Sequence, residues 1–376
     1  MSILRKQILH FLAGAVLLSL TAFAEPAPHE FTYDGFRVPQ PGTVLEFPRT
    51  HASHPGYKIE WWYLTGHLYA STGERFGYQA TFFRNGLKPQ QEYSEQPFNN
   101  GQLYLTHMAV TDVSGKSFYF EQRFSREGWD AYARTDRLEV RHGNWSLTAD
   151  PDVTSLEMHT SINSEVQMQL NLKPEKKLLR FGEDGTSRKG PAPEARSFYL
   201  TFSRMLTEGS LTIGDQQYQV TGSSWMDHEI ASNQLDPNYT GWDWIAIQLK
   251  DGWELKAYLL REKDGSPSPY SALIWIDPEG NTSYYGTDSF EWDKPSYWKS
   301  VATDASYPIS PSIRTTHPVT NQPVEFNFDP VLDDQELNLP GSTYWEGAGR
   351  ILDASGNETG SAYLELVGYA GRIRGL

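Results

Sequence analysis

Short runs of alternating hydrophobic and polar residues, separated by turn-forming residues, make up most of this chain. Such runs are typical of β-strands, because successive side chains of a strand point to opposite faces of a sheet. The 12 Trp, 21 Tyr and 18 Phe, beside 31 Gly and 23 Pro, also favour strands and turns over helices. We therefore predict an all-β protein, and we favour closed barrels because closure leaves no unpaired edge strand.

One strand-like pattern occurs twice. Residues 60–68 read Glu-Trp-Trp-Tyr-Leu-Thr-Gly-His-Leu, and after a Gly-containing turn residues 80–84 read Ala-Thr-Phe-Phe-Arg. Residues 241–249 read Gly-Trp-Asp-Trp-Ile-Ala-Ile-Gln-Leu, and after a shorter turn residues 257–261 read Ala-Tyr-Leu-Leu-Arg. Because Trp, the aromatic residue two positions later, the following Leu and the Ala–Arg pair recur in the same order, the pattern indicates an internal duplication.

The duplication divides the chain into two units. Residues 221–227 align without gaps with residues 359–365, so a matched segment also stands at the far end of each copy. A polar, loop-like stretch near residues 230–240 separates the copies. We predict an N-terminal barrel at residues 25–235 and a C-terminal barrel at residues 236–376, both of ordinary domain size.

Each copy of the repeated strand has one face that suits a ligand chamber. In the first copy this face carries Trp61, Tyr63, Thr65 and His67, and in the second it carries Trp242, Trp244, Ala246 and Gln248. The opposite face of the first copy carries Trp62, Leu64 and Leu68, which suits packing in a core. An alternative is that Trp61 and Trp242 only close the ends of the barrels.

Further polar residues on predicted strands have a structural and a functional interpretation. His107 shares a face with Leu105 and Ala109, so it is either a core histidine or a ligand-binding one. Arg84 and Arg261 recur at matched positions, which favours capping of the barrels through cation–π or carbonyl contacts.

Asp227 and His228 form the strongest chemical pair, and Trp225 shares a strand face with Asp227. A carboxyl group and an imidazole are suited to acid–base catalysis. If a regular strand runs through both residues, they point to opposite faces, and only a strand end or a bulge lets them converge. The pair is therefore either a catalytic site or a hydrogen-bond cluster near the domain boundary.

Several reaction classes are excluded by missing motifs. The sequence has no Gly-x-Ser-x-Gly elbow, no Gly-rich phosphate loop and no dinucleotide fingerprint. His228 and Glu229 begin a zinc-protease pattern, but Ser232 stands where the second His is required. His51 and His54 provide only half a metal site. We expect neither a metal nor a cofactor.

With these residues in view, the chain resembles the AttH-like family, which is related to carotenoid 1,2-hydratases of the CrtC type. The motifs that carry the resemblance are His-Pro-Gly at 54–56, Glu-Trp-Trp-Tyr at 60–63, Thr-His at 106–107, Ser-Trp-Met-Asp-His-Glu at 224–229 and Gly-Trp-Asp-Trp at 241–244. The resemblance implies two lipocalin-like (calycin) barrels in tandem. Family members are linked to lipid metabolism or hydrolysis, and the hydratases add water to an isoprenoid double bond. Ile230 stands where the hydratase pattern has a Trp, which sets this chain apart from carotenoid hydration itself.

Residues 1–24 resemble a cleaved secretory signal. Arg5 and Lys6 precede an apolar stretch that ends at Ala22-Phe23-Ala24, a sequence with small residues at the cleavage positions. Cleavage near Ala24 implies a periplasmic or secreted protein and shifts the formal net charge from −15 by two units to −17. Such an acidic chain is not suited to nucleic acid. Since cysteine is absent, the fold depends on its own core.

Two function classes follow. The first, which we favour because the Trp of the hydratase pattern is missing, is an exported carrier that binds a hydrophobic ligand, a lipid or an isoprenoid, in lipid metabolism or transport. The second is a hydratase (a hydro-lyase) or a hydrolase that acts on such a ligand. Peripheral association with a membrane or a transporter fits either class, and the sequence does not give the oligomeric state. A site that includes Asp227 and His228, with Trp61, Tyr63, His67, His107, Trp225, Trp242 and Trp244 around the ligand, fits both.

Overall fold

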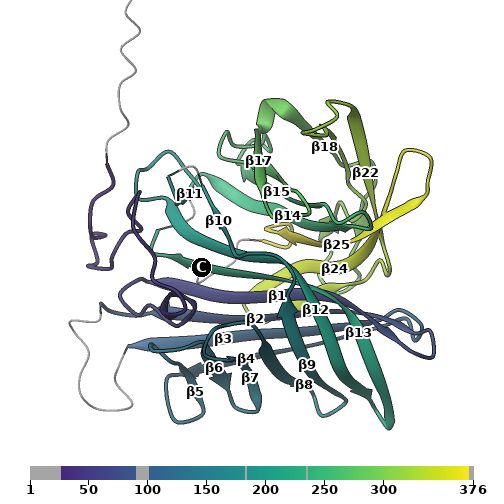
Figure 1. The fold of residues 1–376 in the computed structure, drawn as a ribbon, viewed down its shortest axis with the longest axis horizontal. Coiled ribbons are helices and arrows are strands. Elements are labelled where there is room, and N and C mark those ends of the chain that lie inside the picture. Colours follow the sequence, from purple (N-terminus) through teal and green to yellow (C-terminus); the bar gives the residue numbers. More distant parts are fainter. Residues whose placement is uncertain (1–26, 90–100, 183, 234–235, 372–376) are drawn as a thin grey trace, which may run out of the picture.

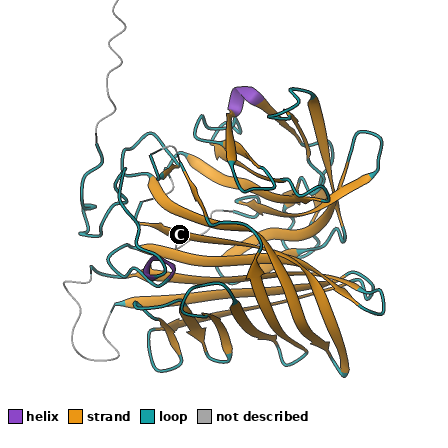
Figure 2. Cartoon of the chain, viewed as in Figure 1, coloured by secondary structure: helices purple, strands orange, loops and turns teal. Residues whose placement is uncertain are grey.

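The computed structural model describes residues 27–89, 101–182, 184–233 and 236–371 (Figure 1). The predicted signal at residues 1–24 lies outside the described residues. Within the described ranges, no helix has the length and apolar character needed to cross a membrane. Nearly all regular structure is β-strand (Figure 2), and the described helices are the short 3-10 turns η1 (Arg49–His51) and η3 (Thr287–Ser289).

The first sheet contains thirteen strands. They are β1 (Ile59–Ala70), β2 (Arg75–Gly86), β3 (Gln102–Asp112), β4 (Ser117–Arg126), β5 (Ala131–Ala133), β6 (Glu139–His142), β7 (Trp145–Ala149), β8 (Leu156–Ile162), β9 (Val166–Pro174), β10 (Leu179–Phe181), β11 (Ser187–Arg188), β12 (Arg196–Ile213) and β13 (Gln216–Ala231). Their order is β4-β3-β2-β1-β13-β12-β9-β8-β7-β6-β5, with β10 and β11 also paired to β12.

The second sheet contains ten strands, and a separate pair lies beside it. The ten strands of the sheet are β14 (Tyr239–Leu249), β15 (Glu254–Glu262), β16 (Ala272–Ile276), β17 (Thr282–Gly286), β18 (Phe290–Asp293), β21 (Ser312–Thr316), β22 (Pro323–Pro330), β23 (Glu336–Leu339), β24 (Ser342–Leu352) and β25 (Glu358–Val367). Their order is β17-β16-β15-β14-β25-β24-β22-β21-β18, with β23 also paired to β24, while β19 (Trp298–Lys299) pairs with β20 (Ser306–Tyr307). Each large sheet curls into a nearly closed barrel, so the prediction of an all-β, lipocalin-like fold is confirmed.

The internal duplication is visible in the strand pairing. In each sheet the first strand lies between the second strand and the last one, as β2-β1-β13 and as β15-β14-β25. The register also agrees, because Arg84 lies opposite Glu60 and Arg261 lies opposite Gly241, each next to the repeated Trp. The matched sequence segments therefore occupy matched places in the two sheets.

The repeated arginines have the predicted structural role. Arg84 donates to the backbone carbonyls of His54 and Tyr57 and to the Glu60 carboxylate. Arg261 donates to the Val367 carbonyl, and its guanidinium lies 4.0 Å from the centroid of the Tyr369 ring. Both therefore hold chain segments that lie beside a barrel end.

A third apolar cluster joins the two barrels. Trp62 and Leu64 belong to the core inside the first sheet, and Ile245 belongs to the core inside the second. A separate cluster, which includes Tyr199 and Tyr258, lies between the sheets. We call this third cluster the interface core.

Ion pairs reinforce the interface core. The fully buried Glu254 of β15 lies 2.6 Å from Lys176 Nζ and 2.6 Å from Arg204 Nε. Lys176 and Arg204 both belong to the first half of the chain, so these ion pairs bind the two halves together.

Candidate functional site

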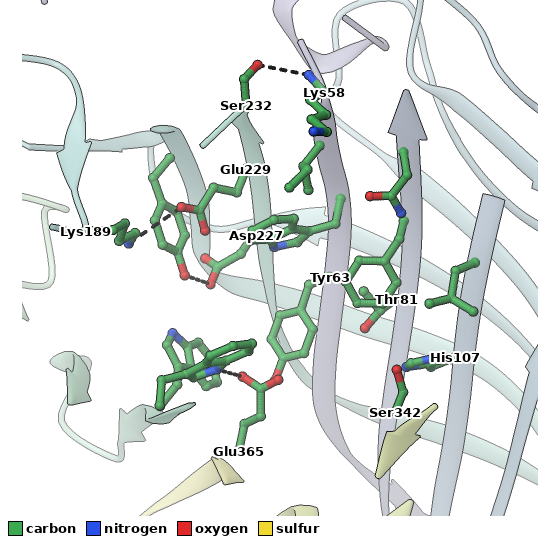
Figure 3. A pocket seen from close by; sticks show the side chains of 18 of the residues that line it. Lys58, Tyr63, Thr81, His107, Lys189, Asp227, Glu229, Ser232, Ser342 and Glu365 are labelled. Carbon is green, nitrogen blue, oxygen red and sulfur yellow. Dashed lines mark hydrogen bonds and ion pairs between the residues drawn. The ribbon is translucent and has the colours of Figure 1, made fainter. Parts of the chain in front are cut away.

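A cavity of about 720 Å³ lies between the two barrels (Figure 3). Its aromatic lining comes from Trp61, Tyr63, Phe83, Phe124, Tyr199, Trp242, Trp244, Tyr258 and Tyr344. We expected a ligand chamber in at least one of the barrels. The structure instead places this cavity against the outer faces of both barrels, since the inner faces are filled by their own cores.

Strand alternation explains which tryptophans reach the cavity. Trp61 and Tyr63 line it from β1, whereas Trp62 between them is fully buried in the core of the first sheet. Trp242 and Trp244 line the cavity from β14. The aromatic-and-polar face predicted from the sequence is therefore the face that borders the cavity at these four positions.

Asp227 is a buried residue that lines the cavity and accepts hydrogen bonds from three side chains. It lies on β13 directly opposite Tyr63 of β1. The Tyr199 hydroxyl donates to Oδ2 at 2.6 Å, the Trp225 indole N–H donates to Oδ1 at 2.8 Å, and the Thr201 hydroxyl also donates to Oδ1. Both oxygens of this buried carboxyl group are therefore hydrogen-bonded.

Glu365 occupies the matched position in the second half. It lies on β25 directly opposite Trp244 of β14, as Asp227 lies opposite Tyr63. Its described hydrogen-bond donor is the Trp242 indole N–H, at 2.8 Å from Oε2. Burial, together with the charges of Asp227 and Glu229, raises the pKa of Glu365 to about 7. This carboxyl group can therefore carry a proton at neutral pH.

A lysine and a third carboxyl group complete the polar side of the cavity. Lys189 Nζ lies 3.6 Å from Glu229 Oε1, and the Ser197 hydroxyl also donates to Glu229. Burial raises the pKa of Glu229, although nearby lysines oppose this shift. Lys189 Nζ also lies 4.6 Å from the centroid of the Tyr199 ring. The lysine therefore contacts both the carboxyl group and the ring of the tyrosine that binds Asp227.

The predicted histidines differ in where they lie. His107 lines the cavity, its Nδ1 is 2.8 Å from the Tyr344 hydroxyl, and burial lowers its pKa to about 4. His67 does not line the cavity, because its Nε2 contacts the Ala362 carbonyl across the interface at 3.0 Å. Burial lowers the pKa of His67 to about 3, so it is a neutral interface residue. Trp225, also predicted to contact ligand, acts on Asp227 instead of lining the cavity.

The prediction of one site that includes both Asp227 and His228 needs correction. β13 runs through both residues without a break, so they point to opposite faces. The His228 ring stacks on Trp62 inside the first barrel, with centroids 4.8 Å apart, and its Nε2 lies 3.0 Å from Glu60 Oε1. His228 is therefore separated from the cavity by the sheet itself.

His54, Glu60 and His228 bring three potential metal ligands within reach of one another. Glu60, however, is bound to His54 Nδ1 at 2.9 Å, to Arg84 Nε at 2.9 Å and to the Ser53 hydroxyl at 3.0 Å as well as to His228. The Arg84 guanidinium lowers the pKa of Glu60 and would repel a cation. This cluster is a closed ion-pair network that supports the barrel end.

Sequence reasoning missed several residues that border the cavity. Glu365 could have been predicted, because it aligns with Asp227 in the repeat. Glu229 could also have been predicted, because it lies two residues after Asp227 on the same strand face. Tyr199 and Lys189 had no such signal, since their importance depends on the side chains that the fold places beside them.

A model of the AttH-like family matches residues 38–369. The chain belongs to the AttH-like family. A candidate AttH from Nitrosomonas europaea, known from a crystal structure, is 33% identical with a TM-score of 0.77, and the match covers 88% of this chain and 98% of that one. No curated protein matches this AttH-like chain.

More distant solved structures have the same fold. Kievitone hydratase from Nectria haematococca is 12% identical with a TM-score of 0.64, and the match covers 92% of this chain and 98% of that one. CghA, solved with Sch210972, is 10% identical with a TM-score of 0.56, and the match covers 91% of this chain and 99% of that one. At these identities the likeness establishes a shared architecture for this AttH-like protein.

Proposed function

We propose that this AttH-like protein is a hydratase that adds water to a carbon–carbon double bond of an apolar small molecule, an isoprenoid or another lipid. The observation that carries the proposal is the pair of carboxyl groups at matched positions of one aromatic cavity, Asp227 and Glu365. Their surroundings differ, and acid–base enzymes assign the roles of acid and base in this way. The fold shared with a kievitone hydratase supports the same reaction class.

Glu365 is the proton donor in this scheme. An unactivated double bond must gain a proton on carbon before water can attack, and a carboxylic acid can supply it when burial keeps the group protonated. The pKa of Glu365, raised to about 7 by burial, meets this requirement at neutral pH. The proton leaves the Glu365 oxygen, and a carbocation forms on the neighbouring carbon.

Asp227 is the base. Water attacks the carbocation, and the proton that this water loses passes to the Asp227 carboxylate, either directly or through the Tyr199 hydroxyl that is bound to it. The aromatic faces of Trp61, Trp242 and Trp244 border the cavity and stabilise a cation by cation–π attraction. One molecule of water is consumed, and before the next turnover Asp227 must lose a proton and Glu365 must regain one.

The cavity also fits a carrier, the second function that the structure favours. Its volume, about 720 Å³, lies within the range of ordinary small-molecule pockets, and most of its lining is apolar. A carrier would use Asp227 and Lys189 to bind a polar head group. On the basis of residues 1–24, we further propose that the protein acts outside the cytoplasm.

Purified protein incubated with a panel of isoprenoid alkenes in oxygen-18 water tests the proposal. We expect mass spectrometry to detect an alcohol that contains the heavy oxygen. Binding, followed by the fluorescence of the tryptophans that line the cavity, is measured on the same samples. Asp227→Asn should stop turnover and preserve binding in a hydratase, whereas in a carrier it should change only the affinity. Saturable binding without a labelled product from any alkene would rule out the hydratase and leave the carrier.

The matched control is His228→Asn. It changes the neighbouring residue on the same strand but acts on the opposite face, inside the barrel. A folded His228→Asn protein should turn over substrate as the unmodified protein does.

A further inference from the structure

A fourth carboxyl group lies directly behind the proposed proton donor. Glu346 of β24 is the register partner of Glu365 on β25. Register partners in antiparallel strands have Cβ atoms about 5 Å apart, so the two carboxyl groups are close neighbours. Glu346 does not border the cavity and is fully buried.

Glu346 lacks the partners that an ionised carboxylate needs. Neither of its oxygens has a hydrogen-bond partner in the described part of the chain. Burial raises the pKa of Glu346 well above its usual range, and the charge of Glu365 raises it further. The neighbouring Tyr63 and Tyr344 hydroxyls lower this pKa only in part. Because an unpaired buried charge is very costly, the group is held neutral, with its proton in place.

Tyr63 connects Glu346 to the cavity. Its hydroxyl is also buried without a hydrogen-bond partner among the described residues. Burial raises the pKa of Tyr63, and the neighbouring Glu346 and Glu365 carboxyl groups raise it further. In Figure 3 the Tyr63 side chain extends toward Glu365. A small rotation of the hydroxyl lets it accept from one carboxyl group and donate to the other.

We propose that Glu346 is a buried proton store that reprotonates Glu365 through the Tyr63 hydroxyl after each turnover. Glu346 gives its carboxyl proton to the Tyr63 oxygen, and Tyr63 gives its own hydroxyl proton to the Glu365 carboxylate. One proton moves, Tyr63 stays neutral, and Glu346 carries the charge until it is protonated again. Glu346 is a positioning residue in this scheme, because it does not touch the substrate.

A route for the returning proton lies on the other side of Glu346. The hydroxyl of its neighbour Tyr344 contacts His107 Nδ1 at 2.8 Å. His107 Nε2 contacts the side chain of Gln122 at 3.1 Å, and Gln122 is partly exposed. Gln122 only accepts this hydrogen bond, but His107 itself borders the cavity. A proton taken up by the His107 imidazole can therefore pass through the Tyr344 hydroxyl to Glu346.

Infrared spectroscopy of the protein without ligand tests the store directly. At neutral pH we expect a carbonyl stretch of a buried protonated carboxylic acid that shifts in heavy water and is missing in Glu346→Gln. The matched control is Glu336→Gln, since Glu336 is also buried but accepts hydrogen bonds from Thr303 and Tyr307. That control should leave the band unchanged. If no band depends on Glu346, the group is ionised and the proposal is wrong.

Kinetics test the transfer and rest on the proposed hydratase function. Glu346→Gln should leave the first turnover unchanged in a single-turnover experiment. Steady-state turnover should fall by about 100-fold, the lower end of what side-chain proton transfer contributes, and small carboxylic acids in the buffer should restore it. Equal loss in both experiments would make the residue structural and overturn the proposal.

Two further outcomes separate this proposal from the proposed function. If no alkene is hydrated by the unmodified protein, the hydratase function fails, whereas the infrared experiment still decides whether Glu346 stores a proton. If Glu346→Gln does not fold, Glu346→Met replaces it in both experiments. An apolar side chain is tolerated where a polar one is neutral and unpaired, so Glu346→Met should be at least as stable as the unmodified protein.

Discussion

The cavity has one wall from each barrel: β13 carries Asp227 in the first, and the matched strand β25 carries Glu365 in the second. The two carboxyl groups have opposite surroundings. Asp227 accepts hydrogen bonds from three side chains, and Thr201, its register partner on β12, is one of these donors. Glu365 has Glu346 as its register partner on β24, so an acid stands where the other wall has a donor. Asp227 therefore has three hydrogen-bond donors where Glu365 has one, and in the proposed hydratase this difference assigns the roles of base and acid.

The largest expected effect is the loss of the acid. Glu365→Gln removes the proton that the substrate must receive but preserves the shape of the wall. We expect turnover to fall by about 10²–10⁴-fold, the usual contribution of a general acid, with ligand affinity little changed. Steady-state kinetics and a fluorescence titration measure both quantities. Unchanged turnover would mean that the two walls do not differ in function.

The second prediction concerns stability. Asp227→Asn should destabilise the protein by about 1–3 kcal/mol, because an amide cannot accept all three of the hydrogen bonds that the carboxylate accepts. Glu365→Gln, at the matched position, should cost much less because Glu365 has one described donor. Urea unfolding of both variants measures the difference. Equal losses would contradict the contrast between the walls.

The third prediction restores the missing donor. Turnover of the unmodified protein should fall as the pH rises through about 7, because Glu365 then loses the proton that it must donate. Glu346→Thr supplies a hydroxyl like that of Thr201, which favours the ionised form of Glu365 and lowers its pKa. The fall should then begin at a pH lower by about one unit. A pH profile of turnover that does not move would contradict this account of the pKa of Glu365.

The smallest effect is expected at Trp242. Its indole N–H binds Glu365 and lowers the pKa of that carboxyl group. Trp242→Phe removes the donor and keeps an aromatic ring, so the pKa should rise and the fall of activity should move to higher pH by about half a unit. A shift toward lower pH would be opposite in sign to the prediction. Trp244→Phe is the control, because it changes a neighbouring lining residue.

The sequence predicted which side chains share a strand face better than it predicted where the cavity lies. Alternation alone separated Trp61 from Trp62, because the side-chain period of a strand is fixed. Alternation also implied that His228 and Asp227 point to opposite faces of a regular strand. The sequence did not show, however, that β13 continues through both residues. The position of the cavity depends on how two barrels pack, and residues such as Tyr199 acquire a role only from that packing.

The interface core and the ion pairs of Glu254 have a consequence for how the molecule unfolds. Melting one barrel alone would expose the interface core to water and separate Glu254 from Lys176 and Arg204. Each Å² of apolar surface exposed in this way costs about 25 cal/mol. We therefore expect calorimetry to record one cooperative transition, with equal calorimetric and van't Hoff enthalpies. A fragment that contains a single barrel would present an uncovered apolar face and is expected to aggregate.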